Sequence, residues 1–302
     1  MSTWRRALAA AGVRDPELRG DYDAQRRLVA RFRRSSYLAA RLLLPAPVLP
    51  HVVAATAVMH HGDNLLDTGS RPQRVAAWAS WEQRVRKALE TGVGDDPAIR
   101  ALLHTVAAYP RLREALEDYL ATATAELEFT GFTTEADFQA YVDAYSLPAF
   151  MLVGTLLGPE ADDGGYRALC RTLMEGSQRL DFVNDLAEDL PEGRLGIPAE
   201  TLARFSLTPE DLVAGQAPAG LRDLVNDQID AARTSLESAR ELTALAAPWG
   251  RALVNAVIEI ELLTADAAAA RGAGLLNGSA GPPLPATLRV LHHARKLRRT
   301  TA

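Results

Sequence analysis

Helical segments separated by short breaks run through this sequence, and this pattern limits the fold more than any other feature. Alanine and leucine are abundant, whereas alternating runs of Val, Ile, Thr and Tyr are almost absent, which favours helices over sheets. Helices of roughly 12 to 25 residues fit between the breaks. The breaks, rich in glycine and proline, lie at residues 45–50, 68–71, 92–97, 131–134, 158–165, 191–198 and 278–285. The pattern predicts an all-α protein.

Length and hydrophobic content predict one domain. The chain has 302 residues, of which 48% are hydrophobic, enough for one large core. We expect residues 1–302 to form a single helical bundle, with about 30 N-terminal and about 10 C-terminal residues at its periphery. In such a bundle, a central ligand cavity lies between facing helices.

Charge and cysteine content exclude several classes of protein. The net charge of −5 gives no reason to expect nucleic-acid binding, so the basic runs at 26–34 and 289–299 are solvated faces or phosphate contacts. Cys170 is the only cysteine, which excludes a disulfide framework and predicts a reducing, cytoplasmic setting. No stretch approaches the roughly 20 apolar residues of a membrane span, so stable membrane insertion is not expected. The oligomeric state stays open.

A first acidic cluster closes the apolar stretch that begins near Val48. In the sequence of residues 60–67, HHGDNLLD, Asp63 and Asp67 are four apart and share a helix face with His60. The two carboxylates repel each other, so a cation should compensate them. An exposed acidic helix end is the alternative. His60 is a general base, a hydrogen-bond donor to diphosphate, or a histidine satisfied by a neighbouring helix.

A second acidic cluster occupies residues 178–189. Asp181, Asp185 and Asp189 form a ladder at four-residue steps, with Gln178 on nearly the same face. No basic residue lies on that stripe, and carboxylate oxygens suit Mg²⁺, which commonly bridges to substrate phosphates. Two such helices facing across a cavity are predicted to hold several Mg²⁺ ions around one diphosphate.

Both clusters, with two further elements, resemble the squalene and phytoene synthase family. Residues 34–45, RSSYLAARLLLP, carry a Ser-Phe-like element and a Leu-Leu-Pro at the family's distance before the first cluster. The second cluster is similar to the family's Q-x-x-N-x-x-R-D-x-x-x-D, followed by a Gly-Arg and a proline at 193–198. The Tyr141–Tyr145 segment resembles the family's tyrosine-bearing central helix. The resemblance covers roughly residues 30–300.

The resemblance implies an isoprenoid synthase α fold with a magnesium and diphosphate site. It implies that the metal ligands are Asp63, Asp67, Asp185 and Asp189. Tyr141 and Gln178 would line the cavity, and Ser36 would lie near its mouth. The family ordinarily joins two identical prenyl diphosphates head to head, which requires cationic residues beyond the metal sites.

This chain departs from the family where those extra cations are expected. His60 and Asn184 stand where relatives commonly have Arg, Asp181 stands for Asn, and Ser35 replaces a basic residue. The small Gly-x-x-Gly of the central helix has become residues 147–150, LPAF, which predicts bulk and a backbone break. Because a buried second diphosphate needs charge compensation, we expect one substrate to be neutral. The pattern looks like the branch that prenylates aromatic acceptors such as carbazoles and indoles.

The predicted reaction is therefore Mg²⁺-dependent transfer of a dimethylallyl or geranyl-type group to an electron-rich aromatic ring, with release of diphosphate. Asp181 and Asp143 are candidate bases or acceptors for a ring N–H, and Asp181 is equally a further metal ligand. Head-to-head condensation of two prenyl diphosphates is the first alternative. A non-catalytic isoprenoid-binding protein is the second.

Other residues have two interpretations each. Tyr37, Tyr145 and Phe182 form either a wall that tolerates a carbocation or part of the core. Arg34, like Arg33, contacts the diphosphate or is simply solvated. We also assign Asn64 and Asn184 to substrate binding. Glu126, which precedes a turn, is expected at the surface.

Overall fold

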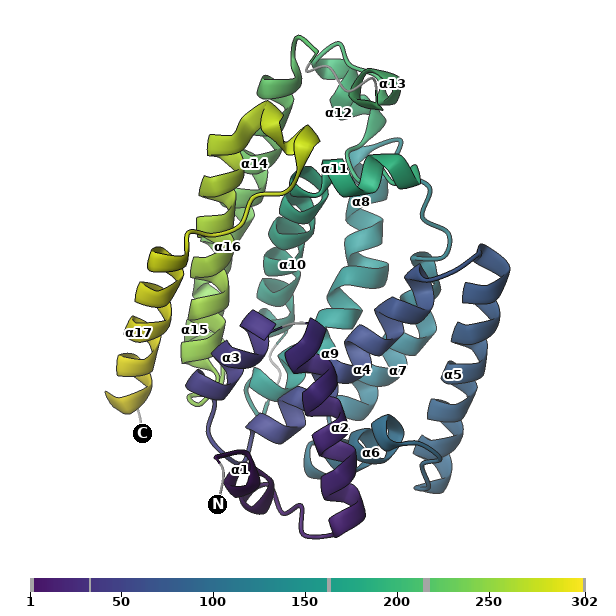
Figure 1. Cartoon of the computed structure of the whole chain (residues 1–302), viewed down its shortest axis with the longest axis vertical. Coiled ribbons are helices and arrows are strands. Elements are labelled where there is room, and N and C mark those ends of the chain that lie inside the picture. Colours follow the sequence, from purple (N-terminus) through teal and green to yellow (C-terminus); the bar gives the residue numbers. More distant parts are fainter. Residues whose placement is uncertain (1–2, 33, 162–163, 214–217, 301–302) are drawn as a thin grey trace.

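The computed structural model describes residues 3–32, 34–161, 164–213 and 218–300, and within these ranges it contains helices and no strand (Figure 1). Arg33 lies outside the described residues. The all-α prediction is confirmed. Each of the seven predicted breaks falls between two helices, because glycine and proline interrupt the backbone hydrogen bonding of a helix at these points.

Seventeen α-helices are described in these ranges. The first nine are α1 (Thr3–Ala10), α2 (Pro16–Phe32), α3 (Arg34–Leu43), α4 (Leu49–Asp67), α5 (Arg71–Thr91), α6 (Pro97–Ala108), α7 (Leu112–Thr122), α8 (Glu135–Tyr141) and α9 (Leu147–Leu157). The others are α10 (Gly165–Asn184), α11 (Leu186–Asp189), α12 (Ala199–Arg204), α13 (Pro209–Val213), α14 (Leu221–Ser238), α15 (Leu242–Leu245), α16 (Arg251–Arg271) and α17 (Leu284–Thr300). Short 3₁₀ turns are η1 (Ala123–Ala125), η3 (Leu190–Glu192), η4 (Ala239–Glu241) and η5 (Gly272–Asn277), and η2 (Val142–Ser146) is a π-helix.

Packing links the two helices that lead into the acidic clusters. Helix α9 contacts both α4, which ends in the first cluster, and α10, which leads into the second. On its other sides α10 packs against α14 and α16 (Figure 1). One hydrophobic cluster extends from Trp4 to Ala294, in agreement with a single domain. The central cavity remains a prediction.

The N-terminal helices are not peripheral, contrary to expectation. Trp4, Leu8 and Tyr22 are buried in the main core, and α2 packs against α4 and α6. The Tyr22 hydroxyl lies 2.9 Å from the Thr105 hydroxyl. The arginine-rich composition of this segment concealed its buried face.

The predicted backbone break at Pro148 does not occur. α8, η2 and α9 form one continuous helical run from Glu135 to Leu157, and Pro148 lies in the first turn of α9. Proline lacks an N–H and its ring clashes with the preceding turn of a regular α-helix. The wider π turn at Val142–Ser146 comes directly before it and accommodates it.

That run of 23 residues, Glu135–Leu157, is also long and apolar enough to cross a membrane. The expectation that no segment approaches this length is therefore wrong for this helix. Its most apolar window is 67% buried inside the protein, as in the core helix of a globular bundle.

Candidate active site

The first acidic cluster lies in the last two turns of α4. The Tyr145 hydroxyl donates a hydrogen bond to Asp63 Oδ1 at 2.7 Å. Tyr145 comes from the π-helix η2, where the wider turn shifts side chains relative to a regular α-helix. Tyr145 therefore contacts the predicted metal ligand directly, as a donor that fixes the carboxylate.

Gly62 allows a second tyrosine to approach the same cluster. A Cβ on Gly62 would occupy the position of the Tyr119 hydroxyl. This hydroxyl is buried and has no hydrogen-bond partner among the residues the structure describes. Burial and the negative charges of Asp63 and Asp67 raise the pKa of Tyr119. It remains a neutral donor directed at the acidic site.

Glu126 is the main site residue that the sequence did not reveal. It was expected at the surface, but its side chain is only 2% exposed. The Tyr141 hydroxyl donates to one of its oxygens and the Arg194 guanidinium pairs with the other. The same guanidinium lies 5.1 Å from the Phe129 ring centroid. The Gly-Arg motif marked Arg194 as part of the family pattern, but no local signal connected it to Glu126.

Carboxylates outnumber cations around this network. Partial burial and the charge of Glu126 raise the pKa of Asp67 to about 7, although its side chain reaches solvent and Arg194 opposes the shift. Burial also raises the pKa of Asp189 to about 6, against the effect of Arg194 and with that of Asp185. One guanidinium therefore acts on carboxylates of both clusters, and it does not neutralise them.

The second cluster is not one straight stripe. α10 ends at Asn184, Asp185 has φ −98° and ψ 16°, and Asp189 belongs to α11, which lies across the end of α10 (Figure 1). The predicted ladder is therefore interrupted at Asp185. Its two halves lie on different helices joined at that residue.

Asn184 does not extend into open space for a substrate, contrary to expectation. Its Oδ1 accepts from the Ala280 N–H at 2.8 Å, and its Nδ2 donates to the Ala280 carbonyl at 3.1 Å. Both polar atoms of the amide are thus hydrogen-bonded to the segment between η5 and α17. The Asn184 side chain therefore joins the end of α10 to the segment before α17.

A facing carboxylate that the sequence did not single out is Glu261 on α16. Burial and the negative charge of Asp181 raise the pKa of Glu261 to about 8. No cation among the described residues contributes to that shift. Gln178, predicted near Asp181, instead accepts from the Ser146 hydroxyl at 2.8 Å. In the sequence, the position of Glu261 inside the apolar segment 257–263, VIEIELL, was the signal that could have identified it.

Two other predicted contacts lie outside this site. Asp143 pairs with Arg171 at 2.6 Å and is 55% exposed, so the expectation that it faces the cavity is not met. A π-helix changes the angular spacing of residues, which the sequence analysis did not anticipate. Asn64 is exposed, and its Oδ1 accepts from the Thr68 hydroxyl at 3.3 Å.

The N-terminal candidates differ in exposure. Arg34 and Ser36 are exposed on α3, while Tyr37 is buried in the main core. The His60 ring lies 5.0 Å from the Phe32 ring. The structure therefore assigns Tyr37 a packing role.

Aromatic side chains form a separate cluster beneath the second acidic segment. Phe182 stacks on Phe129 with ring centroids 5.6 Å apart, and Tyr141 lies 5.9 Å from Phe182. A Cβ on Gly196 would collide with the Phe182 ring, so this glycine permits close packing of the loop. Phe132 and Phe138 complete the cluster. Phe182 is thus part of a core, next to Tyr141 of the acidic network.

The donor set suits magnesium. Asp63, Asp67, Asp185 and Asp189 present only oxygen donors, and the buried Tyr119 hydroxyl lacks a partner beside two of them. Within residues 3–32, 34–161, 164–213 and 218–300, no three acidic or imidazole side chains are close enough to form a cage. Mg²⁺ commonly retains waters and binds through one or two carboxylates together with substrate phosphates.

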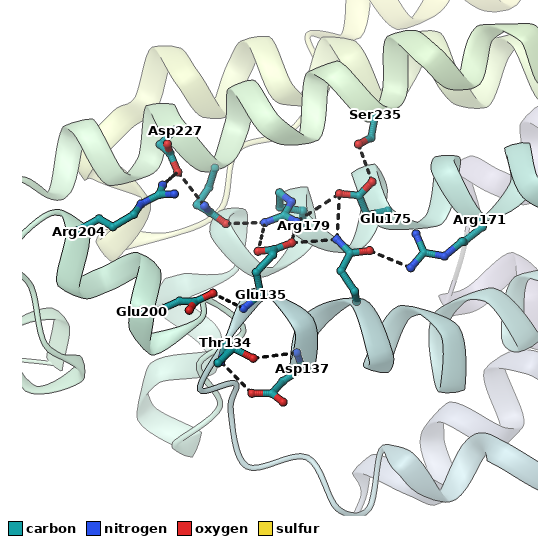
Figure 2. Close-up of polar contacts among 12 residues, drawn as sticks. Thr134, Glu135, Asp137, Arg171, Glu175, Arg179, Glu200, Arg204, Asp227 and Ser235 are labelled. Atoms are coloured by element: carbon teal, nitrogen blue, oxygen red, sulfur yellow. Dashed lines mark hydrogen bonds and ion pairs between the residues drawn. The ribbon is translucent and has the colours of Figure 1, made fainter.

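Figure 2 shows a second polar region, centred on Arg179 of α10. Arg179 and Asp181 are two residues apart on this helix and so point to opposite faces. Arg179 is buried there, pairs with Glu135 and Glu175, and donates to Gln228 at 3.2 Å. A cavity of about 460 Å³ adjoins it, also lined by Arg204 and Asp227 among others. The ion pairs join α8 to α10, and the hydrogen bond to Gln228 joins α10 to α14.

Comparisons with known proteins give the family. The model for squalene/phytoene synthase matches residues 29–289. The bifunctional protein CrtB/UppS of Streptomyces coelicolor is 28% identical over 76% of this chain, which spans only 41% of that protein. The 15-cis-phytoene synthase of Synechococcus elongatus is 25% identical, covering 72% of this chain and 74% of the relative.

Solved structures share the fold. A dehydrosqualene synthase in complex with ligand has a TM-score of 0.83 at 20% identity, covering 94% of this chain and 98% of that one. Squalene synthase HpnC from Alicyclobacillus acidocaldarius has a TM-score of 0.69 at 24% identity, covering 97% and 98%. The predicted isoprenoid synthase fold is confirmed, and prenyltransferase is the enzyme class that the family match supports. The chain belongs to the squalene/phytoene synthase family.

Proposed function

We propose that this chain is a magnesium-dependent prenyltransferase that removes diphosphate from an allylic prenyl diphosphate bound between α4 and the α10–α11 junction. The observation that carries the proposal is the network in which Arg194 and Glu126 connect the two aspartate clusters. A diphosphate would add negative charge to a carboxylate-rich site, so it requires divalent cations there. Bound magnesium would neutralise the leaving diphosphate and favour cleavage of the allylic C–O bond.

The side chains of this chain have distinct tasks in that reaction. Asp63 and Asp67 would bind magnesium and orient the diphosphate from α4, and Asp185 and Asp189 would do so from the second cluster. Tyr145 holds the Asp63 carboxylate in one orientation through its 2.7 Å hydrogen bond. Arg194 supplies a permanent positive charge between the clusters.

The acceptor that we favour is a second prenyl diphosphate, joined head to head. The donor C1–O bond breaks and its electron pair leaves with diphosphate, while C1 forms a bond to the acceptor double bond and the acceptor loses a proton. Support comes from the relatives, which are named as phytoene, squalene and dehydrosqualene synthases. The relatives thus favour what the sequence analysis held as its first alternative. They give the aromatic acceptor no support.

One structural observation still favours a neutral aromatic acceptor as the second candidate. Asn184 is engaged by Ala280 and supplies no positive charge, and Asp181 faces Glu261. A carboxylate at Asp181 repels a second diphosphate, whereas it accepts a hydrogen bond from a ring N–H or phenol.

Product analysis separates these functions. The purified protein is incubated with Mg²⁺ and with dimethylallyl, geranyl, farnesyl or geranylgeranyl diphosphate, each alone and each with an electron-rich carbazole or indole. A coupled hydrocarbon or cyclopropyl diphosphate from one prenyl diphosphate alone supports head-to-head condensation. Product that forms only with the aromatic compound supports the second candidate. Binding without turnover in every mixture, or turnover undiminished by EDTA, overturns the proposal.

A further inference from the structure

Two stretches of the chain have a charge opposite to that of the whole. The protein carries a net charge of −5, yet residues 24–43 and 267–302 contain no Asp or Glu. Each stretch contains six basic side chains. They are far apart in the sequence, and the catalytic proposal uses neither as a unit.

The fold brings these two stretches together. α3 and α17 contact each other, and both pack on α16. The Arg298 guanidinium donates to the Leu42 carbonyl at 2.9 Å, which joins the C-terminal ends of the two helices. Figure 1 shows α17 and α3 as neighbours on the side of the bundle opposite α5. Because α3 and α17 contact each other, their exposed side chains lie on neighbouring parts of the surface, which together make up the α3–α17 face.

Large apolar side chains interrupt the positive charge on this face. On α17, Leu284 is 69% and Leu288 56% exposed, and they lie one turn apart. On α3, Leu38 is 47% exposed and lies between the exposed Arg34 and Arg41 at helical spacing. The exposed basic and imidazole side chains of α17 are Arg289, His292, His293, Arg295 and Lys296.

Phe32 connects this face to the acidic site. It is 53% exposed at the end of α2, and its ring lies 5.0 Å from that of His60. His60 is one helical turn before Asp63 on α4. The face formed by Phe32, α3 and α17 therefore borders the region in which we place the diphosphate.

We propose that this face docks the enzyme on the surface of an anionic lipid bilayer. Basic side chains attract acidic headgroups, and leucine and phenylalanine side chains enter the boundary between headgroups and acyl chains. A nucleic acid would use the same charge but would leave Leu284 and Leu288 exposed to water. The docking gives apolar prenyl chains a short path between membrane and active site, and it holds whichever acceptor the enzyme uses.

Vesicle co-sedimentation of the full chain tests this proposal. We expect binding to vesicles of phosphatidylcholine containing about one-third phosphatidylglycerol, and weak binding to phosphatidylcholine alone. Raising the ionic strength from about 0.05 M to about 0.5 M should release the protein, because the Debye length shortens. Equal binding to both vesicle types, or no binding to either, overturns the proposal.

The two lysines of the chain provide a matched pair of variants. Lys296→Glu on α17 should weaken binding about 30-fold, since two units of charge change close to the membrane. Lys87→Glu makes the same change on exposed α5 and should leave binding within about twofold. Equal losses in both variants would show that only overall charge matters, and the docking face would be wrong.

The leucines separate a membrane from other occupants. Leu284→Ser with Leu288→Ser should weaken vesicle binding at least about tenfold, whereas Val93→Ser with Val213→Ser, also exposed positions, should not. Thermal melting and turnover of a dispersed substrate verify that each variant is folded. Tight binding to an oligonucleotide without vesicle binding would assign the face to nucleic acid. A dimer that dissociates in the leucine variant, again without vesicle binding, would assign it to a second copy of the chain.

Discussion

Both acidic clusters consist of aspartates, but the structure holds them in place in different ways. On α4, Asp63 receives a side-chain hydrogen bond from Tyr145, and Gly62 lets Tyr119 pack against the same turn. At the α10–α11 junction, the chain changes direction at Asp185, and the preceding Asn184 is fastened to the Ala280 backbone. The first cluster lies on one helix, and side chains from other elements hold it in place. The position of the second cluster depends instead on how α10 and α11 are joined.

This difference indicates where each cluster is vulnerable. A substitution near the first cluster should act through packing around α4. A substitution near the second should act through the angle between α10 and α11, or through the protonation of Glu261, whose pKa is raised beside Asp181. Arg194 is common to both, since it influences Asp67 and Asp189.

The largest expected effect tests whether the clusters act together. Asp67→Asn and Asp189→Asn should each lower kcat/KM about 1,000-fold, because each removes a charged ligand for the metal that neutralises diphosphate. Asp143→Asn removes a carboxylate that pairs with Arg171 on the outside and should stay within about threefold. Steady-state diphosphate release measures all three. Full activity in either of the first two variants would contradict a shared metal site.

The next effect concerns only the first cluster. Gly62→Ala should lower the free energy of unfolding by about 3 kcal/mol, because a Cβ would occupy the position of the Tyr119 hydroxyl. Gly20→Ala, in the open on helix α2, should instead raise it by about 0.5–1 kcal/mol. Urea titration measures both. Gly62→Ala combined with Tyr119→Phe should recover part of the loss, and no recovery would mean that another contact limits this turn.

A smaller effect distinguishes the second cluster by its pH dependence. The pKa of Glu261 is raised to about 8, whereas the unfolded chain releases that proton near pH 4.3. Stability from this group is therefore complete below about pH 4 and decreases as the pH rises to about 8. Glu261→Gln should remove this decrease, giving a gain on the order of 2 kcal/mol at pH 9. Melting curves recorded in EDTA between about pH 5 and about pH 9 measure this gain in stability. Parallel pH profiles for variant and wild type would show that Glu261 is ionised in the fold.

The smallest effect tests the hydrogen bonds between Asn184 and the Ala280 backbone. Asn184→Ala should cost about 1 kcal/mol, since both hydrogen bonds to Ala280 are lost and water partly replaces them. Asn226→Ala, exposed on α14, provides the control and should change the free energy of unfolding by less than about 0.5 kcal/mol. Hydrogen exchange at the Ala280 amide should increase only in Asn184→Ala. Unchanged protection there would show that other contacts hold this segment.

Local patterns predicted most of the fold. The breaks at residues 45–50 and 278–285 were readable because glycine and proline act on their own backbone. Pro148 was misread, since a π turn elsewhere in the same run can accommodate a proline. The Glu135–Leu157 run was likewise missed as an apolar helix of membrane-spanning length, because the break had been placed inside it.

The sequence likewise predicted only part of the candidate site. Spacing identified Asp63 and Asp67, which are neighbours on one helix. It could not find Glu126 or Glu261, because Glu126 meets its partners from the turn after η1 and Glu261 meets Asp181 from α16. It also misassigned Asn184 and Asp143, whose hydrogen-bond partners lie 96 and 28 residues away.

The sequence by itself determined that this protein is helical, that it contains two aspartate clusters at helical spacing, and to which family it belongs, because these follow from patterns along the chain. Tertiary structure alone decided which charges meet. Arg194 reached Glu126, Asn184 turned to Ala280, and the two basic stretches came to share one face. The reason is physical: electrostatic and hydrogen-bond energies depend on distance in space, which the order of residues along the chain does not specify.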